Sequence, residues 1–128
     1  MEPLLVMKTA SVLLALAALG GLVMAVTGFR GGHPPIVLAM GHGFLAAAAV
    51  TLLAYAYFTV GLPALAGWAL LLFLLAAAGG AVLNLNYHWK KLPLSKGLMT
   101  VHALLAVVGF AMLLMATLGV PKGISSLA

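Results

Sequence analysis

The feature that most constrains the fold is a set of four apolar stretches, each long enough to cross a lipid bilayer as a helix. They lie at about residues 3–28, 36–59, 64–87 and 96–119. A helix of about 20 residues crosses the hydrocarbon core of a bilayer. The stretches are continuous runs rich in Leu and Ala, whereas membrane strands would be shorter segments of alternating polarity. The sequence therefore predicts an all-α integral membrane protein.

The composition narrows the function as well as the fold. Of 128 residues, 66% are hydrophobic and 5% are charged, a balance that would make a soluble domain of this size aggregate. The absence of cysteine excludes disulfide exchange, thiolate metal sites and iron–sulfur clusters. The one acidic residue, Glu2, stands at the N-terminus, which disfavours a carrier that needs an intramembrane carboxylate. We expect the lipid bilayer as a partner and no nucleic acid, and redox chemistry would require a cofactor.

Short connectors predict how the four helices are arranged. The segments between the apolar stretches contain few residues, so consecutive helices should be antiparallel neighbours in an up-down-up-down bundle. Prolines precede the second, third and fourth helices, where proline suits a helix start, and Ser95 could cap the fourth. We expect residues 1–128 to form a single transmembrane domain, with 121–128 as an exposed tail.

The two halves of the chain resemble each other. Gly20 and Gly21 recur 59 residues later as Gly79 and Gly80, and His42 recurs 60 residues later as His102. Paired glycines and a paired histidine in the same order indicate an internal repeat of one helical hairpin. Each repeat crosses the membrane twice, so the two hairpins have the same orientation and the two histidine helices run parallel.

The repeated residues should share one depth in the membrane. Counted from Pro35 and Ser95, each histidine lies seven residues into its helix, which is about 10 Å. Both glycine pairs fall at the same level. In a four-helix bundle the second and fourth helices are diagonal, so the histidines should face each other, while the other diagonal offers only glycine and alanine. This arrangement predicts room for a flat group between the histidines.

Ionisable side chains inside a membrane segment are costly to bury and usually mark a functional site. A planar macrocycle whose metal takes one imidazole from each side would use both histidines, so we predict one haem b with His42 and His102 as axial ligands. We expect the second ring nitrogen of each to donate to a carbonyl about one turn back in its own helix, near Leu38 and Leu98. The residues that could neutralise the propionates are Arg30, Lys90, Lys91 and Lys96, with His33 and His88.

This layout, across residues 20–109, resembles the four-helix haem-binding core of the membrane cytochrome b superfamily. In that family the second and fourth helices carry the histidines and the first and third carry glycines. Many members hold a second haem through histidines about fourteen residues further along; here those positions are Ala56 and Ala116. The resemblance therefore implies a single haem, and it argues against electron transfer from haem to haem across the membrane.

The function predicted on this basis is single-electron transfer, either as an electron-transfer protein or as a quinol-linked oxidoreductase. Quinone or another redox partner would supply or accept the electrons. The residues that could contact a quinone head group, or simply end the third helix, are Asn84, Asn86, Tyr87 and His88.

Two other interpretations stay open. The histidines could bond across helices and the glycines could allow close packing, in a non-catalytic subunit of a larger respiratory or photosynthetic complex or in an oligomer. The second interpretation is a copper site, because Met99 lies one turn before His102 and could approach the same metal. Met40 points largely away from His42.

The basic residues also predict an orientation. The loops at 29–35 and 88–96 carry Arg30 and three lysines, against Lys8 and Lys122 on the other side. Loops rich in Lys and Arg stay in the cytoplasm. We therefore expect both termini outside the cytoplasm, in a bacterial inner membrane.

Overall fold

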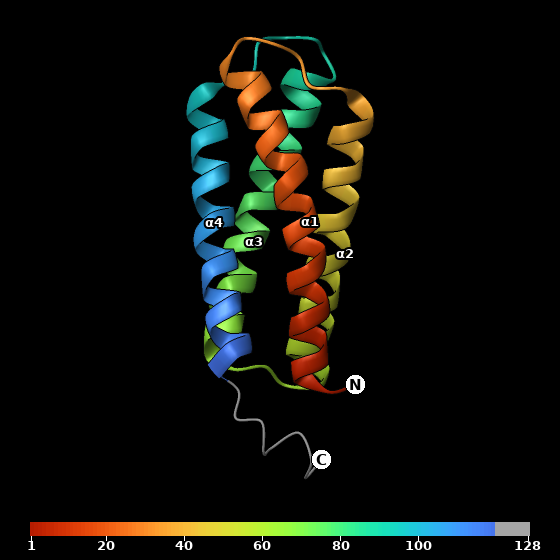
Figure 1. Ribbon diagram of the computed structural model, residues 1–128, viewed down its shortest axis with the longest axis vertical. Helices are drawn as coiled ribbons and strands as arrows, with labels where there is room; N and C mark the ends of the chain where they lie inside the picture. Colours follow the sequence, from red (N-terminus) through yellow and green to blue (C-terminus); the bar gives the residue numbers. More distant parts are fainter. Residues whose placement is uncertain (120–128) are drawn as a thin grey trace.

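The computed structural model describes residues 1–119, which form an up-and-down bundle of four long helices (Figure 1). The elements are α1 (Pro3–Phe29), α2 (Ile36–Thr59), α3 (Ala64–Val82) with its continuation η1 (Leu83–His88), and α4 (Lys96–Gly119). With α3 and η1 counted as one span, each helix is long and apolar enough to cross a membrane. The predicted all-α membrane bundle is confirmed, while the tail predicted at 121–128 lies outside the described residues.

The helix starts follow the local sequence. Pro3 occupies the first turn of α1, and Pro35 and Pro63 stand immediately before α2 and α3. Proline lacks an N–H group and has a fixed φ, so it suits positions whose N–H has no partner within the helix. The Ser95 hydroxyl accepts a hydrogen bond from the backbone N–H of Leu98 at 3.3 Å, which is the cap predicted for α4.

The third helix departs from the prediction at its end. A regular α-helix was expected to residue 87, but η1 is a π-helix, in which the Trp89 N–H bonds to the Asn84 carbonyl at 2.7 Å. In this geometry His88 Nε2–H donates to the Pro34 carbonyl at 2.6 Å, and its Nδ1 lies 3.3 Å from the Asn84 side-chain amide oxygen. The widened turn therefore ties the end of α3 to the loop before α2.

The bundle consists of two hairpins. α1 packs mainly along α2, and α3 mainly along α4, while contacts between the hairpins are fewer. The loops at 30–35 and 89–95 lie together at one end, here named the double-loop end, and the N-terminus and the 60–63 loop lie at the other (Figure 1). α2 and α4 are therefore parallel and diagonal, as the internal repeat predicted.

Large buried side chains are concentrated in the half of the bundle near the N-terminus. The members of this hydrophobic core are Val6, Met7, Ala10, Leu14, Ala49, Leu53, Ala56, Ala66, Ala69, Leu70, Phe73, Leu113 and Ala116. In the other half the buried helical side chains are small, as at Ala17 and Ala76, apart from Met99. Val37 and Leu118, which are 79% and 83% exposed, typify the apolar outer surface that faces lipid. Only one half of the bundle is therefore filled by large side chains.

Candidate functional site

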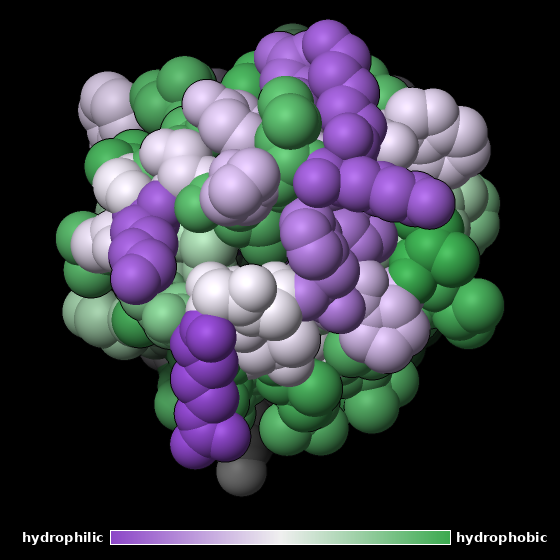
Figure 2. Space-filling model, turned by 90° about the horizontal axis from the view of Figure 1, so that it is seen from above, coloured by the Kyte–Doolittle hydropathy of each residue, from purple (hydrophilic) through white to green (hydrophobic). Residues whose placement is uncertain are grey.

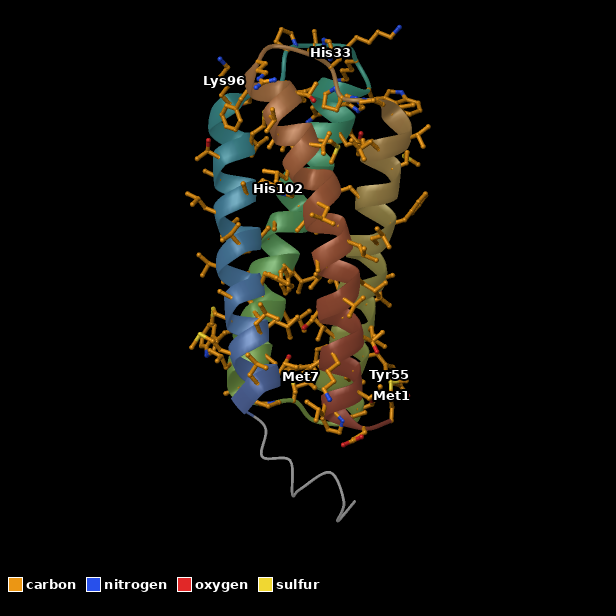
Figure 3. The ribbon with its side chains drawn as sticks, in the orientation of Figure 1. Met1, Met7, His33, Tyr55, Lys96 and His102 are labelled. Atoms are coloured by element: carbon orange, nitrogen blue, oxygen red, sulfur yellow. The ribbon has the colours of Figure 1, made fainter. Side chains whose placement is uncertain are left out.

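The structure brings His42 of α2 and His102 of α4 together in the half of the bundle that lacks large side chains. Their ring centroids are 6.1 Å apart and the ring planes are inclined at 69°. Both residues are half-buried. Figure 3 places His102 between the double-loop end, marked by His33 and Lys96, and the middle of the bundle. Two imidazoles thus meet across a diagonal at one depth.

Each ring is held by its own hairpin. The Nδ1–H group of His42 donates to the Ala17 carbonyl of α1 at 2.7 Å. The Nδ1–H group of His102 donates to the Ala76 carbonyl of α3, also at 2.7 Å. A backbone carbonyl can only accept, so both rings carry a hydrogen on Nδ1. Each hairpin therefore provides one imidazole and the backbone carbonyl that orients it, a pair here named a half-site.

The acceptors predicted near Leu38 and Leu98, one turn back in the same helix, were wrong. A carbonyl inside a helix points along the axis toward the N–H four residues on, whereas the His42 and His102 side chains project away from their helices. Small residues on α1 and α3 let α2 and α4 pack closely against them. Each ring therefore reaches a carbonyl of the neighbouring helix, which is α1 for His42 and α3 for His102. The sequence signal that could have identified it is an alanine three residues before each glycine pair.

The second glycine of each pair lies directly against an imidazole. A Cβ atom at Gly21 would stand 3.0 Å from Cε1 of His42, and one at Gly80 would stand 3.0 Å from Cε1 of His102. Both distances are shorter than ordinary van der Waals contact. Gly21 and Gly80 therefore make room for the imidazoles themselves, in addition to any space that they leave for a flat group.

The first glycine of each pair has more space. A Cβ atom at Gly20 or Gly79 would be 3.8 Å from Cβ of the facing histidine, which is an ordinary contact. A methyl group at the first glycine of a pair would make an ordinary contact with the histidine, whereas one at the second glycine would lie too close to the imidazole. This contrast gives each half-site a matched control position.

The second nitrogen of each ring, Nε2, is the atom left for chemistry. No hydrogen bond engages Nε2 of His42 or His102 within residues 1–119, and no side-chain nitrogen or oxygen in that part of the chain is both buried and unpaired. Both Nε2 atoms are therefore unpaired but not fully buried in this part of the chain. A neutral imidazole whose Nδ1–H is bonded to a carbonyl is the usual form of a histidine metal ligand.

The separation of the ring centroids can be compared with that of two imidazoles bound to one metal. A metal–imidazole bond of about 2 Å on each side, plus about 1 Å from each nitrogen to its ring centre, separates the centroids by about 6 Å. The observed separation is 6.1 Å. Among the described residues no group of three or more His, Cys, Asp and Glu side chains gathers at one point. A metal at this position would have two protein ligands, and its other ligands would come from a non-protein group.

The predicted cations lie apart from the rings, at the double-loop end. Arg30 and Lys90 are exposed there, and His33 and Lys96 are seen at the same end in Figure 3. α2 begins six residues before His42, so this end is about 9 Å from the rings along the helix axis. Lys91 is exposed too, and it lines a pocket with His33.

The methionines considered for copper are not directed at the rings. The buried Met99 side chain packs against Gly28 of α1, where an added Cβ would be 3.2 Å from its sulfur. Gly28 is seven residues, about 10 Å, from Gly21, which contacts the imidazole of His42. Met40 is 40% exposed on the outer surface. The structure therefore does not assemble a His and Met ligand set.

The positions of a possible second haem are filled by the hydrophobic core. Ala56 is fully buried and Ala116 is nearly so, and both belong to the cluster that contains Leu53, Phe73 and Leu113. A second macrocycle between α2 and α4 would have to displace these side chains.

The remaining residues considered for a quinone head group lie in or beside η1. The Nε2–H group of His88 already donates to the Pro34 carbonyl, and its Nδ1 lies beside the Asn84 side chain. Asn86 is exposed and Tyr87 is half-buried. These residues end the third helix, and in this structure His88 serves to join two loops.

Comparison with models of known protein families, with curated proteins and with solved structures gives no match, so the function must be inferred from these residues and their geometry.

Proposed function

We propose that the protein is a membrane b-type cytochrome that binds one haem b between its two hairpins, with His42 and His102 as axial ligands. The observation that carries the proposal is the pair of half-buried imidazoles whose centroids are 6.1 Å apart and whose Nδ1–H groups are both bonded to backbone. Two opposed neutral imidazoles are the ligand set of a six-coordinate haem iron. The bound haem would supply a one-electron redox couple.

The chain's own residues orient the ligands. The hydrogen bonds to Ala17 and Ala76 fix the ring orientation and keep the hydrogen on Nδ1, so that Nε2 offers its lone pair. Because His42 and His102 would fill both axial positions, oxygen binding is disfavoured and electron transfer is favoured. The small side chains at this level leave the space that the hydrophobic core fills elsewhere.

The alternative of histidines that merely join helices is less well supported. The hydrogen bonds from His42 to α1 and from His102 to α3 do join helices, but unpaired polar groups are costly inside a membrane. These bonds engage only the Nδ1 atoms, and neither Nε2 atom has a hydrogen-bond partner among residues 1–119. A metal ligand accounts for that free nitrogen.

The double-loop end would receive the propionates. Arg30 and Lys90 are exposed there, and the only acidic residue, Glu2, belongs to the opposite end. Carboxylates form short charge-assisted hydrogen bonds with such cations. By the excess of basic loops this end faces the cytoplasm of a bacterial inner membrane, where quinol or another small reductant would exchange electrons with the protein.

The proposal is tested by the absorbance spectrum of the protein purified in detergent after expression with ample haem. We expect low-spin, six-coordinate haem b. His42→Ala and His102→Ala should each leave five-coordinate or absent haem, and the double variant should lose it. His33→Ala, a histidine away from the rings, is the matched control and should keep the low-spin spectrum. A colourless wild-type preparation, or a spectrum unchanged by loss of either ligand, would exclude the cytochrome.

The same preparation distinguishes an enzyme from a subunit. Reduction of the haem by a quinol analogue in the isolated protein is expected for a quinol-linked oxidoreductase. Reduction only after a partner protein is added would place the chain in a larger complex.

A further inference from the structure

A pocket of about 440 Å³ opens at the double-loop end, between the start of α2 and the end of α3. We name it the end pocket. The residues that line it are His33, Pro34, Ile36, His88, Trp89 and Lys91. Trp89 is 66% exposed, and His33 and Lys91 are exposed as well, so the rim of the pocket lies on the outer surface. The ammonium of Lys91, the imidazole of His33 and the indole N–H are donors available there, while Pro34 and Ile36 are apolar.

The backbone at Lys91 is the unusual feature of the pocket. Lys91 has φ +56°, in the left-handed region that a side chain disfavours. The position 60 residues earlier, the repeat spacing of the two histidines, is Gly31 with φ +79°. Glycine adopts this conformation without a steric penalty. The turn alone would thus favour glycine in both hairpins, which points to a use for the lysine side chain.

A second departure from regular geometry flanks the same pocket. The π-helix η1 ends at His88, whereas the corresponding end of α1 stays α-helical to Phe29. Through its bond to the Pro34 carbonyl, His88 joins two walls of the pocket. π-Helical turns and strained residues tend to occur at functional sites. Within residues 1–119, both occur in the hairpin that carries Trp89 and Lys91 and not in the other one.

We propose that the end pocket binds the phosphate head group of an anionic phospholipid. The Lys91 ammonium and the His33 imidazole would donate to phosphate oxygens, and the apolar surface of Ile36 would contact the glycerol and the first acyl carbons. Trp89 is suited to the interface at which lipid head groups lie. Figure 2 looks onto this end and shows hydrophilic side chains spread over it with hydrophobic ones around them. This site does not depend on haem.

The position of the rim on the outer surface distinguishes this ligand from a haem propionate, which would carry a similar negative charge. A propionate would approach from between the histidines, inside the bundle, whereas Trp89 and Lys91 form an exposed rim. The bilayer supplies phospholipid at that surface. Arg30, Lys90 and Lys96 add positive charge at the same end, which favours an anionic lipid over a zwitterionic one.

Native mass spectrometry of the full chain in detergent tests the site, with phosphatidylglycerol and phosphatidylcholine as probes. We expect preferential retention of phosphatidylglycerol. Lys91→Gly should weaken it about fivefold, since one lysine near a lipid surface contributes an effect of this size. Glycine suits the backbone at position 91, so this variant should keep the wild-type melting temperature. Lys90→Gly removes the same charge outside the pocket, so it should weaken lipid retention much less than Lys91→Gly does.

Several outcomes would overturn the site. The site would be refuted by equal retention of the two lipids, or by lipid retention that Lys91→Gly does not change. Displacement of the lipid by inorganic phosphate would indicate a site for a free anion, and displacement by a quinol analogue would indicate a quinone site. If Lys91→Gly instead shifted the haem potential while lipid retention stayed the same, Lys91 would serve a propionate. Loss of haem in the wild type would refute the cytochrome and leave this test intact.

Discussion

Replacing Gly80 with alanine, and comparing it with Gly79→Ala, tests whether the glycines position the two histidines that we propose as haem ligands. Both changes add one methyl group to the same turn of α3, and each should favour the helix by up to about 1 kcal/mol. The methyl group at Gly79 would find its nearest neighbour at 3.8 Å. At Gly80 it would be 3.0 Å from Cε1 and 3.5 Å from Nδ1 of His102. Only the second substitution should displace a ring.

The size of the effect follows from this contact. The His102 ring would have to retreat by a few tenths of an ångström from the helix whose Ala76 carbonyl holds it at 2.7 Å. Overpacking typically costs about 1–3 kcal/mol, and the strained hydrogen bond contributes up to about 1 kcal/mol more. Part of this cost is already present in the haem-free protein, so we expect haem binding to weaken by about 1–2 kcal/mol, which is roughly a 5- to 30-fold loss of affinity.

The assay is a haem titration of each variant in detergent, followed by absorbance, together with the melting temperature of the haem-free protein. Gly80→Ala should show a lower affinity and a smaller low-spin fraction, and Gly79→Ala should resemble the wild type. The other hairpin provides a replicate, because Gly21 and Gly20 show the same contrast against His42. Equal haem affinities and spectra for Gly80→Ala and Gly79→Ala would refute the reasoning.

Three further predictions concern topology, copper and η1. A C-terminal reporter that is active only in the cytoplasm should stay silent, because the basic double-loop end is expected inside; a bright signal would reverse the orientation. Met99→Leu should change neither the haem spectrum nor the copper content, because its sulfur packs against Gly28; copper in the wild type that disappears in this variant would restore the copper site. His88→Ala should lower the free energy of unfolding by about 1 kcal/mol, because the hydrogen bond to Pro34 is lost. This should be measurable as a lower melting temperature, while the low-spin spectrum should be kept.

Features that depend on apolar length and repeat spacing could be predicted from the sequence. A run of about 20 apolar residues has few alternatives to a membrane helix, so the four spans and their order follow directly. The pairing of His42 with His102 depends on the repeat. An error in a helix boundary shifts both copies together, and the relative depth of the two rings is therefore preserved.

Features that depend on helix rotation and on long-range contacts could not be predicted. Whether His42 bonds to its own helix or to Ala17 is decided by how closely α1 approaches, which hydrophobic periodicity does not reveal in helices that are apolar on all sides. The π-turn of η1 is linked to Pro34, 54 residues away in sequence. Nothing local in the sequence of η1 indicates that contact.

The division of the bundle into two halves explains how a weakly packed level can hold two imidazoles at a fixed distance. Each ring is oriented within its own hairpin, by Ala17 or Ala76, so no hydrogen bond between the hairpins is needed at that level. The distance between the hairpins is instead set where they pack tightly, in the core that includes Leu53, Phe73 and Leu113. Orientation and separation of the histidines are thus determined by different parts of the chain.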